Sequence, residues 1–187
     1  MESHVKVYGH AVHPILIPLP LGLLSGSVAF DLLHRVSGDR AWGTAATAAL
    51  GAGLVGGVVA APFGLVDWLA LPDGTRAKRV GLVHGIGNAG MLSLFGASWW
   101  LRREEPETLQ SGPFALSLAG LTMAALAGWL GGELVERMGV GVDLGANLNA
   151  PSSLSDQPAR TIPPELLAKM SGEQPVGREE PAADAGR

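Results

Sequence analysis

Four long stretches of the sequence carry almost no charge, and short charged loops separate them. The stretches cover residues 14–30, 41–66, 80–101 and 111–132. A helix of roughly 20 predominantly apolar residues matches a hydrocarbon core about 30 Å thick, whereas a water-soluble helix of that length has a polar face. The sequence therefore predicts an all-α integral membrane protein with spans at about residues 14–33, 41–71, 80–101 and 111–135.

The short loops predict how these spans are arranged. Helices joined by short loops pack as antiparallel neighbours, so we expect residues 1–144 to form an up-down four-helix bundle in the lipid bilayer. Both termini would then lie on one side of the membrane, here called the terminal side. Glycines four residues apart let helix backbones approach closely in lipid. Four such pairs occur, namely Gly22 with Gly26, Gly53 with Gly57, Gly81 with Gly85, and Gly128 with Gly132. Glycine pairs exposed on the outside of the bundle would also allow a homodimer.

Residues 145–187 differ in composition from the bundle. They are rich in Pro, Ser, Ala and charged residues. Such a segment buries too little apolar surface to offset the entropy lost on ordering. We expect a polar, mostly disordered tail, with one short helix at residues 164–170, where two prolines lead in and a glycine follows.

Charge and cysteine content exclude several classes of function. The net charge is −4 and no stripe of Lys and Arg is present, which disfavours nucleic-acid binding. The chain has no cysteine, which excludes thiolate metal sites and covalent haem attachment through a Cys-x-x-Cys-His motif. Any haem would have to be bound without a covalent bond.

Ionisable residues from all four spans fall at a similar depth near the terminal side. Charged and titratable groups inside a membrane are costly unless they are paired or bind a ligand, so such a layer predicts a site. Its members are His10 and His13 at the start of the first span, Asp67 near the end of the second, His84 near the start of the third, and Glu133 at the end of the fourth.

Two histidines in this layer suit a haem b group. His13 and His84 come from different helices, and neutral imidazole is a good axial ligand for haem iron. Small residues surround the second histidine, so we expect Gly81, Gly85 and Gly87 to leave room for a flat macrocycle. The sequence thus predicts a non-covalent haem between the first and third spans.

Further residues near these histidines have expected roles. We expect Arg76, Lys78 and Arg79, in the loop before the third span, to pair with the haem propionates. Asp67 would accept a hydrogen bond from the second nitrogen of a ligating imidazole. Asn88, one helical turn from His84, would face the edge of a haem or a quinone.

The same residues allow other interpretations. His10, His13, His84, Asp67 and Glu133 also form a set of imidazoles and carboxylates that suits non-haem iron, zinc or manganese. In a purely structural alternative, Asp67 caps loop amides and pairs with Arg76 or Arg79, and His13 fixes the start of the first helix. In a further alternative, the protein is a non-redox membrane scaffold or small transporter, in which Asp67, His84 and Glu133 relay protons or line a polar cavity.

Two ionisable residues lie near the opposite side of the membrane. Asp31 and His34 lie one helical turn apart near the end of the first span. We expect them to form a pair at the membrane interface.

Three stretches of the sequence carry a family resemblance. They are GHAVHPILIPLPLGLL from Gly9, GLVDWLALPDGTRAKRVGLVHGIGN from Gly64, and GWLGGELVERMGVGV from Gly128. Through them the chain resembles bacterial membrane proteins catalogued as the domain of unknown function 2231, over about residues 9 to 142. The motif residues at matching positions are His13, Pro14, Asp67, His84 and Glu133.

The resemblance implies a role in electron transfer and a redox partner. Relatives occur fused to Rieske-type or c-type cytochrome domains, which implies electron transfer. This chain carries no such fused domain, so a quinone or a separate redox protein would be its partner. Taken together, the sequence predicts a multi-pass protein of the bacterial cytoplasmic (inner) membrane. We expect a small b-type electron carrier rather than an enzyme.

Overall fold

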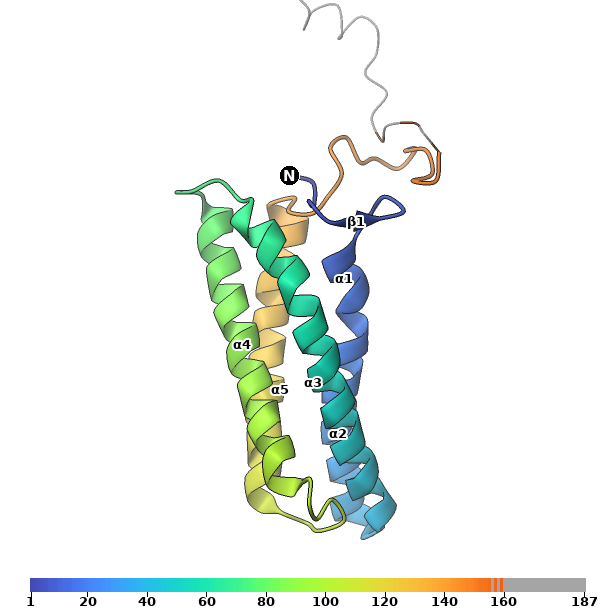
Figure 1. The fold of residues 1–187 in the computed structure, drawn as a ribbon, viewed down its shortest axis with the longest axis vertical. Helices are drawn as coiled ribbons and strands as arrows, with labels where there is room; N and C mark the ends of the chain where they lie inside the picture. Colours follow the sequence, from blue (N-terminus) through green and yellow to red (C-terminus); the bar gives the residue numbers. More distant parts are fainter. Residues whose placement is uncertain (156, 158, 160–187) are drawn as a thin grey trace, which may run out of the picture. The chain divides into compact units, whose positions relative to one another are not determined.

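A computed structural model of the chain describes residues 1–155, 157 and 159. The predicted four-helix up-down bundle is confirmed within this part of the chain (Figure 1). The first span consists of α1 (Val12–Leu16) and α2 (Pro18–Ser37). The others are α3 (Arg40–Leu69), α4 (Arg76–Arg102) and α5 (Ser111–Gly132), which continues into the π-helical turn η1 (Glu133–Arg137). All are long and apolar enough to cross a membrane.

The chain divides into two units, Met1–Leu144 and Gly145–Arg187. The first unit holds all the helices just described. In the second, the described residues up to position 155 form turns. The short helix predicted at residues 164–170, and most of the tail for which disorder is predicted, lie outside the described residues.

The first span contains a break at Ile17. Pro18 and Pro20 have no amide hydrogen, so two carbonyls of the preceding turn lose their helical donors. The chain nevertheless keeps its course, because Ile17 N donates to the His13 carbonyl at 3.2 Å and Leu21 N donates to the Ile17 carbonyl at 3.1 Å. The two helices therefore act as one span of 26 residues.

The ends of the helices follow local signals in the sequence. The Asp39 carboxylate accepts from Ala41 N at 2.9 Å at the start of α3. The Thr75 hydroxyl accepts from Lys78 N at 3.1 Å at the start of α4. Side chains of this type satisfy amides that have no partner within the helix. α2 ends at Gly38, whose φ of 72° is in the left-handed region that glycine adopts at little cost.

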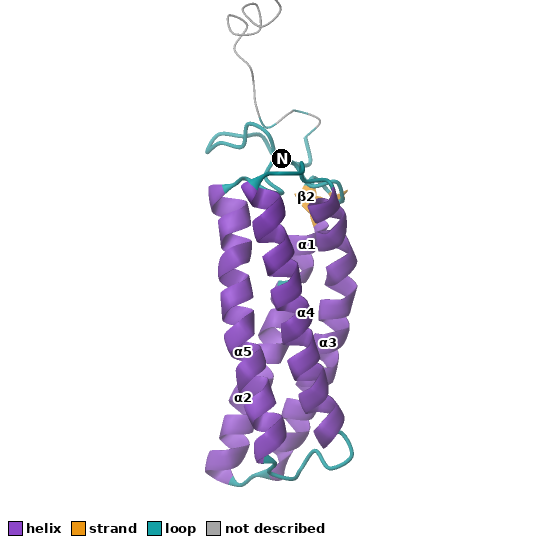
Figure 2. Cartoon of the chain, turned by 90° about the vertical axis from the view of Figure 1, so that its left-hand side faces the viewer, coloured by secondary structure: helices purple, strands orange, loops and turns teal. Residues whose placement is uncertain are grey.

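A short hairpin precedes the first span. β1 (Lys6–Val7) pairs antiparallel with β2 (His10–Ala11), and both lie at the same end of the bundle as the N-terminus (Figure 2). Residues 138–144 reach this end too, because Gly141 N donates to the Met1 carbonyl at 2.8 Å. This end is the terminal side, and the loops at residues 38–39 and 103–110 mark the opposite side.

The helices pack through glycines, but only some of the predicted ones. α2 packs mainly on α3, and α4 mainly on α5. A Cβ added to Gly53 would lie 2.8 Å from Leu24 of α2, and one added to Gly57 would lie 2.6 Å from Leu92 of α4. The prediction was wrong for the glycines whose added Cβ would meet nothing within 4 Å, namely Gly22, Gly26, Gly85, Gly128 and Gly132.

The apolar core of the bundle connects all four spans. Leu24 and Val28 of α2, Leu50 of α3 and Phe95 of α4 are almost fully buried. Met91 of α4 and Ala124 of α5 complete this cluster. The ionisable groups lie on either side of this dry centre, towards the two ends of the helices.

Candidate functional site

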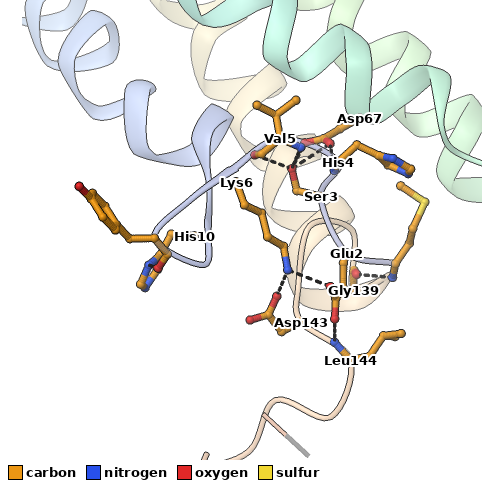
Figure 3. Close-up of polar contacts among 12 residues, drawn as sticks. Glu2, Ser3, His4, Val5, Lys6, His10, Asp67, Gly139, Asp143 and Leu144 are labelled. Atoms are coloured by element: carbon orange, nitrogen blue, oxygen red, sulfur yellow. Dashed lines mark hydrogen bonds and ion pairs between the residues drawn. The ribbon is translucent and has the colours of Figure 1, made fainter. Parts of the chain in front are cut away.

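Asp67 near the end of α3 binds the start of the chain. The Ser3 hydroxyl lies 2.9 Å from each carboxylate oxygen, and His4 N donates to Oδ1 at 2.9 Å (Figure 3). Ser3 is buried. The expectation that Asp67 pairs with Arg76 or Arg79 was wrong, and both imidazoles discussed below bond to other groups. Asp67 instead accepts from the Ser3 hydroxyl and the His4 amide of the N-terminal segment.

A second set of contacts ties the N-terminal segment to residues 138–144. Lys6 Nζ donates to Glu2 Oε2 at 2.9 Å and also to Asp143. Leu144 N donates to Glu2 Oε1 at 2.9 Å. The carboxylates of Asp143 and Glu2 raise the pKa of Lys6, and the Lys6 ammonium, followed by the Leu144 amide, lowers the pKa of Glu2. We call Glu2, Ser3, Lys6, Asp67 and Asp143 the terminal clamp.

His13 joins α1 to α3. Its Nδ1 lies 3.0 Å from the Ala60 carbonyl. Because a carbonyl only accepts, Nδ1 carries the hydrogen and Nε2 keeps its lone pair. The ring lies against Gly64, where an added Cβ would come within 2.7 Å of Cε1. A glycine is therefore required for α3 to approach this imidazole.

His84 makes the matching contact between α4 and α5. Its Nδ1 lies 2.8 Å from the Ala127 carbonyl, so this imidazole also has Nε2 as its basic nitrogen. Asn88 Nδ2 lies 3.1 Å from Nε2 and 2.9 Å from the His84 carbonyl. Asn88 and His84 thus lie on the same face of α4. The ring lies over Gly131, where an added Cβ would be 3.1 Å from Cε1.

The glycines expected to leave room beside His84 are used differently. An added Cβ on Gly81 would lie 2.7 Å from Trp68, and one on Gly87 would lie 3.4 Å from Ala127. Gly85 is exposed on the outside of the bundle. That expectation was wrong, because helix packing rather than open space accounts for the buried glycines.

The cations expected in the loop before the third span lie in the first turn of α4 and have partners within the protein. Arg76 Nη2 donates to Glu133 Oε2 at 2.9 Å, and Arg79 donates to the Gly74 carbonyl at 3.0 Å. Lys78 Nζ donates to the carbonyls of Trp68, Leu69 and Leu71. Arg76 and Arg79 are exposed, so their guanidinium groups remain accessible from the aqueous phase.

The alternative metal set is not assembled in the described residues. There, no three His, Cys, Asp or Glu side chains converge as ligands of one ion. His10 is exposed, with Nδ1 3.1 Å from the Tyr8 carbonyl. Asp67 bonds to Ser3 and Glu133 bonds to Arg76. Of the predicted site residues, His84 and Asn88 are in direct contact, while His13 bonds to α3.

The comparison with protein families agrees with this architecture. The model of a family described as "Predicted membrane protein (DUF2231)" matches residues 9–144. The chain belongs to the DUF2231 family. The resemblance seen in the sequence is thereby confirmed, and the DUF2231 match covers every span together with His10, His13, His34 and His84. Comparisons with curated proteins and with solved structures found no match.

The DUF2231 bundle contains a second polar group that the sequence did not predict. Asp31 of α2 pairs with Arg102 of α4, with Nη1 2.5 Å from Oδ1. Asp31, His34 and Arg102 are all buried, so the expectation of an interfacial Asp31–His34 pair was wrong. The available signal was topological, since an up-down bundle places the end of α2 and the end of α4 on the same side.

Proposed function

We propose that this DUF2231 protein is a small b-type electron-transfer protein in which His13 and His84 hold a haem. The supporting observation is their shared hydrogen-bonding pattern. Each imidazole donates from Nδ1 to a main-chain carbonyl of the adjacent helix, at 3.0 Å to Ala60 and 2.8 Å to Ala127. Metal-ligating histidines are held in this way, because the bond fixes the ring and leaves Nε2 as the ligand.

The residues around the two rings are compatible with this role. If iron were bound at Nε2 of His84, the Asn88 amide would lose its hydrogen bond to that nitrogen. It would keep its 2.9 Å bond to the His84 carbonyl. Arg76 and Arg79 are exposed at the terminal side, where their guanidinium groups would pair with propionates. When bound, haem supplies one-electron chemistry, and the chain sets its potential through imidazole ligation and burial.

The partner and the location complete the proposal. The spans fix the protein in lipid, and we assign it to the bacterial cytoplasmic membrane, with electrons exchanged with a quinone or a separate redox protein. Both termini would lie on one side. This is supported by the contact between the N-terminal segment and residues 138–144, since Met1 N donates to the Gly139 carbonyl at 2.9 Å.

Absorption spectroscopy of the purified protein in detergent tests the proposal. We expect a Soret band that sharpens on reduction, an α-band, and loss of both in His13→Ala and His84→Ala. His10→Ala is the matched control, because His10 is exposed on the hairpin, and its spectrum should equal that of the wild type. Colourless protein after expression with haem supplied would contradict the proposal, as would bands that survive both substitutions.

A second candidate is a scaffold without redox activity. It is favoured by one observation, namely that both nitrogens of His84 already have partners, at 2.8 Å to Ala127 and 3.1 Å to Asn88. In that case His13 and His84 serve only to join helices. Colourless protein whose unfolding temperature falls in both alanine variants would support this candidate.

A further inference from the structure

A buried ion pair joins three helices near the opposite side of the bundle. Asp31 of α2 and Arg102 of α4 have side chains that are only 8% and 6% exposed. Arg102 Nη2 also donates to Ser98 Oγ at 2.9 Å and to Ser117 Oγ of α5 at 3.2 Å. One guanidinium thus contacts side chains from α2, α4 and α5.

Three buried side-chain atoms in and beside this ion pair lack a hydrogen-bond partner in the protein. They are Oδ2 of Asp31, Nε of Arg102 and Nε of Arg35, which follows one turn later on α2. Arg35 is otherwise engaged, with Nη2 donating to the Gln110 carbonyl at 2.8 Å and the guanidinium over the Phe114 ring. One acceptor and two donors are therefore left over, and each such buried group costs about 1–3 kcal/mol when it stays unpaired.

The same three residues line one small, largely enclosed cavity, called the enclosed cavity below. Its volume is about 10 Å³, and its other walls include His34 and Pro113. A space of about 10–15 Å³ on this measure holds one water molecule, provided that polar partners face it. The size and the unpaired atoms therefore point to the same occupant.

We propose that this cavity binds one water molecule. Water donates a hydrogen bond to Asp31 Oδ2 and accepts from the Nε–H groups of Arg35 and Arg102. An ion does not suit the site, because a cation would face two guanidinium groups and an anion would face a carboxylate oxygen. Only a neutral molecule that both donates and accepts matches all three groups.

An open cavity beside the enclosed one gives this water a route to the aqueous phase. The open cavity has a volume of about 570 Å³ and shares His34, Pro106, Thr108 and Leu109 with the enclosed one. It is also lined by Glu104, Glu105 and Glu107 of the loop that precedes α5. Asp31 lies six residues before Ser37, the end of α2, which places it about 9 Å along the helix. The first span thus contains a hydrated site, separate from His13 and His84.

X-ray radiolysis in ¹⁸O-labelled water, followed by mass spectrometry, tests the assignment. Hydroxyl radicals formed from a bound water label the side chains beside it even when they are buried. Pro113 is the reporter, because it lines the enclosed cavity and not the open one. Met91 is the matched control, since it is buried in the dry core and thioethers oxidise readily. We expect ¹⁸O at Pro113 and several-fold less at Met91.

A double variant tests what holds the water. Asp31→Leu with Arg102→Met removes the acceptor and one donor while filling similar volumes, and labelling of Pro113 should then fall to the level of Met91. Labelling of Pro113 in the wild type no greater than that of Met91 would overturn the proposal. Undiminished labelling in the double variant would also overturn it. Should the double variant fail to fold, the wild-type comparison decides by itself.

Discussion

The Asp67 carboxylate lies against the Ser3 hydroxyl, and each of its oxygens is 2.9 Å from Ser3 Oγ. This contact holds the N-terminal segment on the end of α3, across a sequence separation of 64 residues. The carboxylate is needed as an acceptor, because the Ser3 hydroxyl and the His4 amide both donate to it. The terminal clamp therefore depends on Asp67.

Replacing Asp67 should release the N-terminal segment. In Asp67→Ala, the His4 amide loses its acceptor and the buried Ser3 hydroxyl keeps only the Val5 carbonyl, at 3.0 Å. The loss of these bonds to a carboxylate costs about 1–3 kcal/mol of stability. Hydrogen exchange measured by mass spectrometry should quicken over residues 1–11 and stay unchanged in α2. Asp73→Ala is the control, because the Asp73 side chain is 98% exposed. Unchanged exchange over residues 1–11 in Asp67→Ala would show that Asp67 does not hold this segment.

Filling the space beneath the imidazoles should disturb the proposed haem site. A Cβ at position 131 would lie 3.1 Å from His84 Cε1, and one at position 64 would lie 2.7 Å from His13 Cε1. Gly131→Ala and Gly64→Ala should each lower stability by about 1–3 kcal/mol, because the rings must shift. The Soret absorbance of the purified protein should fall in both variants.

Gly128→Ala is the matched control for these two substitutions. It lies on α5 three residues from Gly131, and its added Cβ would meet nothing within 4 Å. Its stability should stay the same or rise by up to about 1 kcal/mol, since alanine suits a helix interior better than glycine. Equal losses of stability in all three variants would mean that the effect does not come from displacing the imidazoles.

Breaking the Asp31–Arg102 pair should cost more than removing it. Asp31→Ala leaves a buried guanidinium without its counter-ion, which destabilises by about 3–5 kcal/mol, whereas apolar replacement of both partners is often neutral or stabilising. The thermal unfolding temperature in detergent should therefore be lower for Asp31→Ala than for the Asp31→Leu, Arg102→Met double variant. Glu104→Ala is the control, because its pair with Arg103 is exposed and such pairs contribute about 0–1 kcal/mol. A lower unfolding temperature for the double variant than for Asp31→Ala would show that an unpaired buried charge is not what destabilises Asp31→Ala.

The spans could be predicted from the sequence, whereas their rotation about the helix axis could not. Uncharged stretches fix where helices cross a membrane, and the described helices follow them. Gly22 with Gly26 and Gly53 with Gly57 have the same spacing, yet only the second pair touches neighbouring helices. Which face a helix turns inward depends on how large side chains interlock, and glycine spacing alone does not contain that information.

The contacts that the sequence did not predict join residues far apart in the chain. Asn88 and His84 are four residues apart on one helix, so their shared face follows from helix geometry. The bond between Ser3 and Asp67 and the pair of Asp31 with Arg102 span 64 and 71 residues. The first depends on where the N-terminal segment lies on the end of α3, and the second on how the ends of α2 and α4 align.

The part of the terminal clamp around Lys6 should hold at neutral pH and loosen at both extremes. Bonding to Asp143 and Glu2 raises the pKa of Lys6, so its contribution is complete below the ordinary lysine pKa and is lost as pH rises through the raised value. Bonding to Lys6 lowers the pKa of Glu2, so that contribution is present above the ordinary glutamate pKa and is lost as pH falls through the lowered value.

Exchange at the Leu144 amide is a direct measure of this pH dependence, because that amide donates to Glu2 Oε1 at 2.9 Å. After correction for the intrinsic pH dependence of exchange, its protection should be flat near neutrality and fall at acidic and at alkaline pH. Lys6→Met should remove the alkaline fall, since no titrating ammonium remains, and should move the acidic fall to higher pH, since Glu2 returns towards its ordinary pKa. An alkaline fall that persists in Lys6→Met would assign it to a group other than Lys6.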